Sequence, residues 1–264
     1  MCGIAGYSLS PSSSVARTLA GQALLAAIAE RGADAVGYAY RSPGATYPTV
    51  IKQRTPASKL LERVAVPDEA TELLVHVRDY TKGHPSIAAN NHPVRHGPVV
   101  GIHNGIIVND DELLAEHACA RVEPRMTVDS EAIFAVAAHS HSDARALEQL
   151  HGSMAAAWLD EREPELLYAA RGTGRPLWVG SGRDGIAFAS TRHALELLER
   201  YCGLRLRKRE LPDGTLLALR AGKVEHSTRF RVSEFEEADP LPAVRAPDER
   251  DFCLRRLATI AAAL

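Results

Sequence analysis

The chain has 264 residues, of which 45% are hydrophobic, and a formal net charge of −2. This length and composition predict one large core or two modest ones, and the mixed charges give no polyanion-binding pattern, so nucleic acid is excluded as an expected partner. There is no run of 18 apolar residues and no signal-peptide pattern, and the four cysteines, at positions 2, 119, 202 and 253, lack CxxC spacing. We therefore expect no membrane span, no structural disulfide and a cytoplasmic location.

The first half of the chain mixes helical and strand patterns. An apolar stretch over 19–30 predicts a helix that ends near Gly32. Acidic residues after Asn109 indicate another helix start. The predicted helices cover 19–30, 58–64, 110–118, 129–139 and 144–150, and the predicted strands cover 36–40, 49–54, 72–77 and 99–102.

The second half consists mainly of short apolar runs separated by turns. Predicted strands cover 153–159, 165–170, 176–180, 186–189, 204–211, 215–220 and 223–227, with a helix over 192–201. Repeated parallel βαβ units are not evident, so an α+β layered fold with mostly antiparallel sheets fits this pattern best. We expect one domain over 1–232, an exposed linker rich in acidic residues and proline over 233–247, and a helix over 248–264. This helix is expected to pack on its own domain, and the alternative is that it docks a partner.

Cys2 is the most informative residue, in the opening sequence MCGIAGY. Once Met1 is removed, a single residue carries both a thiol nucleophile and an α-amine whose usual pKa of about 7.7–8.0 suits proton transfer near neutral pH. The alternative is an ordinary cysteine that lies early in the chain.

Three further sites offer residue types that would recognise an amino acid amide. Arg78, at the end of a predicted strand, could clamp a carboxylate, or form a surface ion pair with Asp79. Asn104-Gly105 could supply two donors to an oxyanion, or form a hairpin turn. Asp129 could bind an ammonium group, or cap the helix that follows it.

Six ordered motifs resemble the signature of class II glutamine amidotransferases, the glutaminase domains of the N-terminal-nucleophile hydrolases. They are MCGIAG at 1–6, RGAD at 31–34, HxRxxTxG at 76–83, NHP at 91–93, HNGIIxN at 103–109 and TVDSE at 127–131. Later segments match as well, so the resemblance spans about residues 1–228. The HNGIIxN wording is most similar to the glucosamine-6-phosphate synthase branch.

The resemblance implies a four-layer αββα sandwich of two mostly antiparallel sheets and a role for each motif. Cys2 would attack the side-chain carbonyl of glutamine and form a γ-glutamyl thioester, with its own amine relaying protons. Asn104 and Gly105 would form the oxyanion hole. The implied substrate-binding residues are Arg78 and Thr81 for the α-carboxylate and Asp129 for the α-ammonium. No cofactor and no metal would be required, and the histidine pairs at 92/96 and 139/141 lack the ligand spacing of a metal site.

Three positions depart from the family pattern. Val77 and Asp79 stand where the family often has threonine and an aromatic residue, and Asn91 stands where alanine is more usual. An acidic residue beside the carboxylate clamp would weaken glutamine binding or shift preference to another γ-glutamyl compound.

The acceptor of the ammonia is not evident, because no synthase domain fits the residues after the resemblance. We therefore expect L-glutamine as substrate and a separate ammonia-accepting synthase subunit as partner. The helix over 248–264 is a candidate contact for that subunit. Two alternatives remain open at this stage: a stand-alone hydrolase of another γ-glutamyl amide, and a catalytically silent regulatory module.

Overall fold

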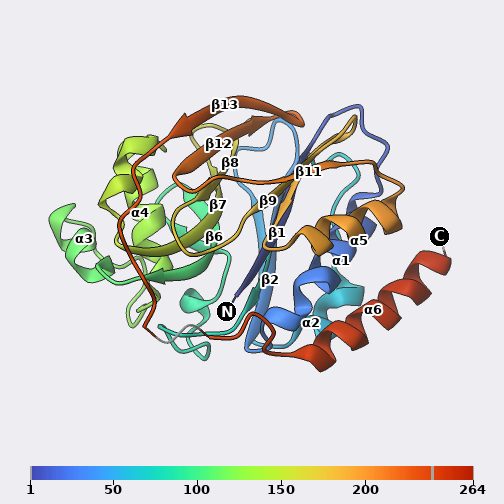
Figure 1. Ribbon diagram of the computed structural model, residues 1–264, viewed down its shortest axis with the longest axis horizontal. Helices are drawn as coiled ribbons and strands as arrows, with labels where there is room; N and C mark the ends of the chain where they lie inside the picture. Colours follow the sequence, from blue (N-terminus) through green and yellow to red (C-terminus); the bar gives the residue numbers. More distant parts are fainter. Residues whose placement is uncertain (1, 239–240, 264) are drawn as a thin grey trace.

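The computed structural model describes residues 2–238 and 241–263, which form two stacked β-sheets with helices on both outer faces (Figure 1). The first sheet has the strand order β11 (Arg207–Glu210), β9 (Trp178–Ser181), β10 (Gly185–Ala189), β1 (Gly3–Leu9), β4 (Glu72–Arg78), β2 (Ala35–Arg41) and β3 (Thr49–Gln53). The second has the order β13 (Lys223–Arg229), β12 (Thr215–Arg220), β8 (Leu167–Arg171), β7 (Gly152–Asp160), β6 (Val99–Ile107) and β5 (Val94–His96). Neighbouring strands within both sheets pair antiparallel.

Helices complete the four layers. The first sheet is covered by α1 (Arg17–Ile28), α2 (Ala57–Leu60), α5 (Arg192–Cys202) and α6 (Pro247–Ala262), and the second by α3 (Asp110–Glu116) and α4 (Ser130–Ser140) (Figure 1). Short 3-10 turns lie at η1 (Ala29–Arg31), η2 (Leu61–Arg63), η3 (Ala88–Asn90) and η4 (Ala144–Gln149). The α+β fold and the αββα sandwich expected from the sequence are confirmed.

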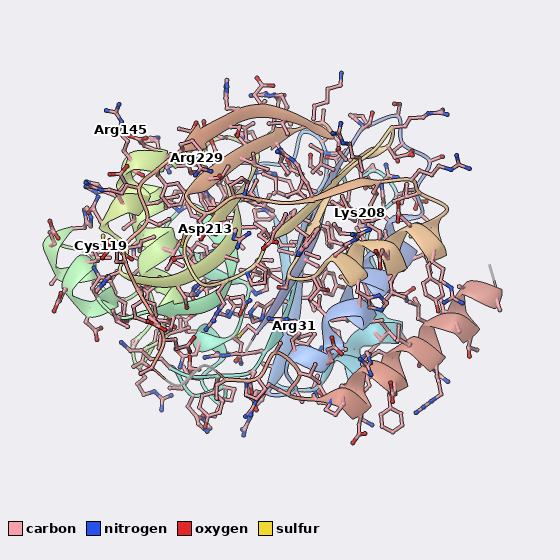
Figure 2. The ribbon with its side chains drawn as sticks, viewed as in Figure 1. Arg31, Cys119, Arg145, Lys208, Asp213 and Arg229 are labelled. Atoms are coloured by element: carbon pink, nitrogen blue, oxygen red, sulfur yellow. The ribbon has the colours of Figure 1, made fainter. Side chains whose placement is uncertain are left out.

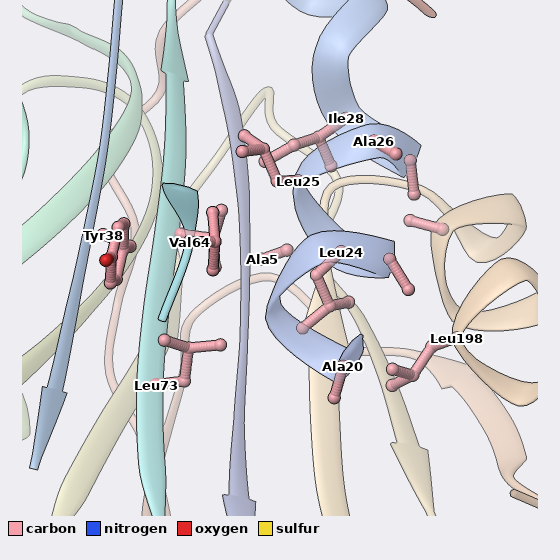
Figure 3. Close-up of a cluster of buried hydrophobic side chains, with 14 of the residues drawn as sticks. Ala5, Ala20, Leu24, Leu25, Ala26, Ile28, Tyr38, Val64, Leu73 and Leu198 are labelled. Carbon is pink, nitrogen blue, oxygen red and sulfur yellow. The ribbon is translucent and has the colours of Figure 1, made fainter. Parts of the chain in front are cut away.

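Three apolar layers hold the sandwich together. Outside the first sheet, Leu24, Leu25 and Ile28 of α1 pack toward Ala5 of β1 and Leu73 of β4 (Figure 3). A second layer lies between the sheets and a third between the second sheet and α4. Burial of apolar surface at about 25 cal/mol per Å² makes such layers the main stabilising contribution.

Two strands were not predicted from the sequence, β1 and β5. The sequence of β1, GIAGYSL, is buried along its whole length, since one face meets α1 and the other the second sheet. A strand that is apolar on both faces shows no alternation of polar and apolar residues. The three residues of β5 are too few for any periodicity.

The C-terminal helix packs on its own chain, as its default interpretation predicted. It spans Pro247–Ala262, and Cys253 and Leu257 are fully buried against the core that contains α1. The last predicted residue, 264, lies outside the described residues. Among those described, no helix is both long and apolar enough to span a membrane.

Candidate active site

Cys2 directly precedes β1, the central strand of the first sheet, which pairs with β10 on one side and with β4 on the other. Its side chain is half-buried, and Sγ donates to the carbonyl oxygen of Asp79 at 3.5 Å. Burial raises the pKa of the Cys2 thiol, while this hydrogen bond and the charge of Arg78 act in the opposite direction. The resting side chain is therefore a thiol that needs a base. The predicted removal of Met1 concerns a residue outside those described.

A buried arginine fixes the backbone of the nucleophile. Arg31, labelled in Figure 2, ends η1 directly after α1. Its Nε donates to the carbonyl oxygen of Cys2 at 2.8 Å. Its side chain is 3% exposed. Gly3 leaves the space for this contact, since a Cβ there would lie 2.9 Å from Ile28 and 3.0 Å from the Arg31 side chain.

Strand alternation directs three more side chains toward the same layer. On β4, Leu74 faces the second sheet, so His76 and Arg78 follow on that face. On β6, Ile102 faces the first sheet, and Asn104 follows on that face. The ends of β4 and β6 therefore bring their polar residues beside the start of β1.

Arg78 is buried and its terminal nitrogens are occupied by the loop that follows it. Nη1 donates to Asn91 Oδ1 at 2.8 Å and to the carbonyl of Asn90, and Nη2 donates to the carbonyls of Lys82, at 2.9 Å, and Gly83. No ion pair with Asp79 is among these contacts, so the surface ion pair considered from the sequence is not observed. The guanidinium is held rigidly and still lines the pocket beside Cys2.

The RGAD motif shapes the backbone beside the nucleophile. A Cβ on Gly32 would lie 2.4 Å from the carbonyl of Arg78, so only glycine permits this approach. Asp34 receives the N–H of Tyr80 on Oδ2 at 2.9 Å and donates its own N–H to the carbonyl of Arg78 at 3.0 Å. These contacts fix residues 78–80, including the Asp79 carbonyl that receives the Cys2 thiol.

A solvent-open pocket brings together residues from five separate parts of the chain. The space within it, part of which is open solvent, amounts to about 230 Å³. Of the six predicted site residues, five line it: Cys2, Arg78, Thr81, Gly105 and Asp129. Asn104 does not line the pocket. It is 1% exposed beside Gly105, and neither its Oδ1 nor its Nδ2 has a hydrogen-bond partner among the described atoms. Because buried amides are almost always paired, this unused pair of atoms is suited to a ligand or a water.

Asp129 holds a negative charge where burial disfavours it. It is 3% exposed, its Oδ2 accepts the N–H of Ile107 at 2.8 Å, and its side chain makes no capping bond to its own helix α4. Burial raises the pKa of Asp129 to about 6. A cationic ligand group would favour the ionised carboxylate.

Three buried histidines at the pocket, of which His92 and His103 line it, were not assigned any role from the sequence. The rings of His76 and His92 stack with centroids 4.1 Å apart, and His76 Nε2 lies 3.1 Å from the carbonyl of His103. His103 in turn lies 2.9 Å from Ser130 Oγ through Nδ1. Burial lowers the pKa of His76 and His103 to about 3 and the pKa of His92 well below its usual value. These rings are neutral, so they shape an uncharged wall. Their positions in the HxR, NHP and HNG motifs were the sequence feature that could have indicated a role in the site.

Among the described residues, no group of three or more histidine, cysteine or carboxylate side chains is arranged to hold a metal ion. His96 pairs instead with Glu131 at 3.0 Å.

Comparison with known proteins decides the family. Residues 72–197 match the family described as "Glutamine amidotransferase domain". The chain belongs to the class II glutamine amidotransferases. A glutamine–fructose-6-phosphate aminotransferase (isomerizing) of Chlamydia trachomatis is 30% identical over 246 residues, covering 90% of this chain and 38% of the relative. One from Escherichia coli is 37% identical over 134 residues, covering 46% of this chain and 21% of the relative.

Solved structures agree on the fold of this class II amidotransferase. A glutamine phosphoribosylpyrophosphate amidotransferase from B. subtilis superposes with a TM-score of 0.68 at 18% identity, covering 86% of this chain and 49% of that one. A structure titled as the allosteric regulatory enzyme of purine biosynthesis gives 0.65 at 17% identity, covering 87% and 49%. The chain spans well under half the length of the curated relatives it matches and about half of these two structures.

Proposed function

We propose that this chain hydrolyses the side-chain amide of L-glutamine through a γ-glutamyl thioester on Cys2 and releases ammonia. One observation carries the proposal: five of the six residues that the family motifs assign to this reaction line a single pocket, although they are distributed over residues 2–129. An amino acid amide needs a nucleophile, an anionic partner and a cationic partner at fixed positions, and the pocket offers all three.

The nucleophile and its base would come from the same residue. Cys2 Sγ attacks the amide carbon, and the free α-amine of Cys2, once Met1 is removed, accepts the thiol proton and delivers it to the departing nitrogen. Ammonia leaves and a thioester remains. Water then attacks the thioester, which releases glutamate and regenerates the thiol. Because burial raises the pKa of the Cys2 thiol, the adjacent base is needed at neutral pH.

Two donors beside the thiol would stabilise the tetrahedral intermediates. The unpartnered amide of Asn104 and the backbone N–H of Gly105 lie at the end of β6 that borders the pocket. Preorganised donors of this kind typically lower the barrier by several kcal/mol. Gly105 has φ +148°, and a Cβ there would lie 1.9 Å from the carbonyl oxygen of Ser153, so the backbone course requires glycine.

The two charged ends of glutamine would be held apart from the reacting amide. Arg78, with Thr81, receives the α-carboxylate, and Asp129 receives the α-ammonium. Binding of the carboxylate has to compete with the carbonyls that now occupy the Arg78 guanidinium. The carbonyls of Lys82 and Gly83 are therefore expected to move away from Arg78 when glutamine binds.

Ammonia release implies an acceptor. The curated relatives are named for transfer from glutamine to fructose 6-phosphate, and this chain spans 38% of the length of the one from C. trachomatis. We propose a synthase partner, and the branch indicated by the HNGIIxN motif favours a sugar phosphate as acceptor. The apolar face of α6 is already occupied by its own domain, which removes one reason to assign that helix to the partner.

The alternative of another γ-glutamyl substrate was suggested by Asp79 beside the clamp and by the lack of an evident synthase domain. The Asp79 carboxylate is paired with Arg245 at 3.1 Å, which offsets its charge, so we retain glutamine as the favoured substrate. The test is ammonia release from L-glutamine compared with product release from γ-glutamyl conjugates. Faster turnover of a conjugate than of glutamine would overturn the assignment.

A further inference from the structure

Asp79 lies beside both Cys2 and Arg78, the expected partner of the substrate carboxylate. Its backbone carbonyl receives the Cys2 thiol, and the residue lines the pocket together with Arg78. A negative charge here acts against ionisation of the Cys2 thiol. By the same electrostatics, it would repel the α-carboxylate of glutamine as it approaches Arg78.

A distant segment of the chain supplies a positive charge to Asp79. Arg245 Nε lies 3.1 Å from Asp79 Oδ2, 166 residues away in sequence. The Asp79 side chain is 13% exposed and that of Arg245 is 41% exposed. The described parts of the segment 233–246, here called the strap, lie between the second sheet and α6. They pass down the side of the molecule that carries α4 and then along its lower edge to α6 (Figure 1).

Contacts on both sides of Arg245 hold the strap against the rest of the chain. The N–H groups of Arg245 and Ala246 both donate to the carbonyl of Glu30 at 2.8 Å. Glu30 directly precedes Arg31, which holds the Cys2 carbonyl. Earlier in the strap, Glu237 pairs with the buried Arg175. The position of Arg245 is thus fixed by its own backbone as well as by its ion pair.

We propose that Arg245 is a positioning and specificity residue of the glutamine site: it offsets the charge of Asp79 and fixes this residue beside Arg78, so that Arg78 can receive the substrate carboxylate. This inference rests on the proposed glutaminase function. It explains how the chain tolerates an acidic residue beside its carboxylate clamp. It also makes the strap part of the site, although the strap contributes no atom to the reaction.

The test compares two charge reversals in the full chain. Arg245→Glu is expected to raise KM for glutamine about three- to tenfold with a smaller change in kcat, as for loss of a partly exposed pair and gain of a repulsion. Arg245→Lys should retain most of the wild-type KM. The control is Arg256→Glu, which reverses a charge on α6 that pairs with Glu62 away from the pocket. If Arg245→Glu lowers the midpoint of thermal unfolding, Arg245→Gln is measured in its place.

A second arm asks whether the effect passes through Asp79. In an Asp79→Asn background, Arg245→Glu should change KM by less than twofold, because the carboxylate that it repels is gone. Alkylation of Cys2 by iodoacetamide at pH 7.5, followed by intact mass, should slow in Arg245→Glu alone and not in the double variant.

The possible results distinguish failure of the Arg245 role from failure of the proposed glutaminase function. An unchanged KM and alkylation rate in Arg245→Glu would overturn the positioning role, as would an equal effect of Arg256→Glu or a full effect in the Asp79→Asn background. If wild type releases no ammonia from glutamine, the proposed function fails, and the alkylation rates still report whether Arg245 acts on Cys2 through Asp79.

Discussion

Arg31 donates a 2.8 Å hydrogen bond from Nε to the carbonyl oxygen of Cys2 and so joins the end of α1 to the residue that carries the nucleophile. Because the guanidinium is buried, the bond is charge-assisted and shielded from water, which makes it stronger than a neutral surface contact. The first helix thereby sets the position of Cys2 relative to the loop that follows β4.

Arg31→Ala is expected to lower kcat for glutamine by about 10–100-fold, because small displacements of a nucleophile are costly to rate. The measurement is steady-state ammonia release by variants whose fold is verified by circular dichroism. Arg17→Ala is the matched control, since Arg17 is also buried and donates to carbonyls, at Ala70 and Ser13, but does not line the pocket. It should reduce stability and leave kcat of the folded fraction near wild type. Equal kcat losses in both variants would contradict the assigned role of Arg31.

Asp129 is expected to make stability and glutamine binding respond to pH in opposite directions. Its folded pKa, about 6, lies above the reference value of 3.8, so its contribution to stability is fully present below about pH 4 and is lost as pH rises through 6. Asp129→Asn should therefore raise the free energy of unfolding at pH 7.5 by up to about 3 kcal/mol, at 1.36 kcal/mol per pKa unit. This gain should vanish near pH 4. Urea titrations at both pH values measure it.

The same variant tests the ammonium-binding role of Asp129. Asp129→Asn should raise KM for glutamine strongly at pH 7.5, and wild-type KM should rise as the pH falls below about 6, where the carboxylate takes up a proton. A variant that is more stable and binds glutamine as well as wild type would leave Asp129 without a role in binding.

Asn104→Ala is expected to reduce kcat by about 10²–10³, the usual cost of a lost oxyanion donor. Stability should change little or improve, because the amide makes no hydrogen bond in the absence of substrate. Asn109→Ala is the control: this residue follows the same strand, and its amide bonds to Gln149 and His151 on the surface. Wild-type activity in Asn104→Ala would remove it from the oxyanion hole.

Much of the fold was predictable because its patterns are local. The amphipathic α5 and the turns of the second half were readable from apolar spacing and glycine. β1 was not, since a strand buried on both faces shows no alternation. The stacking order of strands that meet across long sequence distances, such as β1 between β4 and β10, depends on tertiary packing that no single segment encodes.

The candidate site was likewise only partly predictable from the sequence. Residue types in ordered motifs indicated Cys2, Arg78 and Asp129, which the structure places around one pocket. The partners that orient them were not readable: nothing in the sequence near Arg31 shows that it reaches the Cys2 carbonyl, and nothing near Arg245 indicates Asp79. Such contacts depend on the fold bringing distant segments together.

The most direct test of the central claim combines intact mass with activity on the same preparation. After incubation with L-glutamine and a quench at acid pH, the account predicts a chain that has lost Met1, a γ-glutamyl adduct on Cys2, and steady release of ammonia that Cys2→Ala abolishes while its thermal midpoint stays near wild type. Ammonia release that persists in Cys2→Ala, or turnover by a chain that retains Met1, would contradict it.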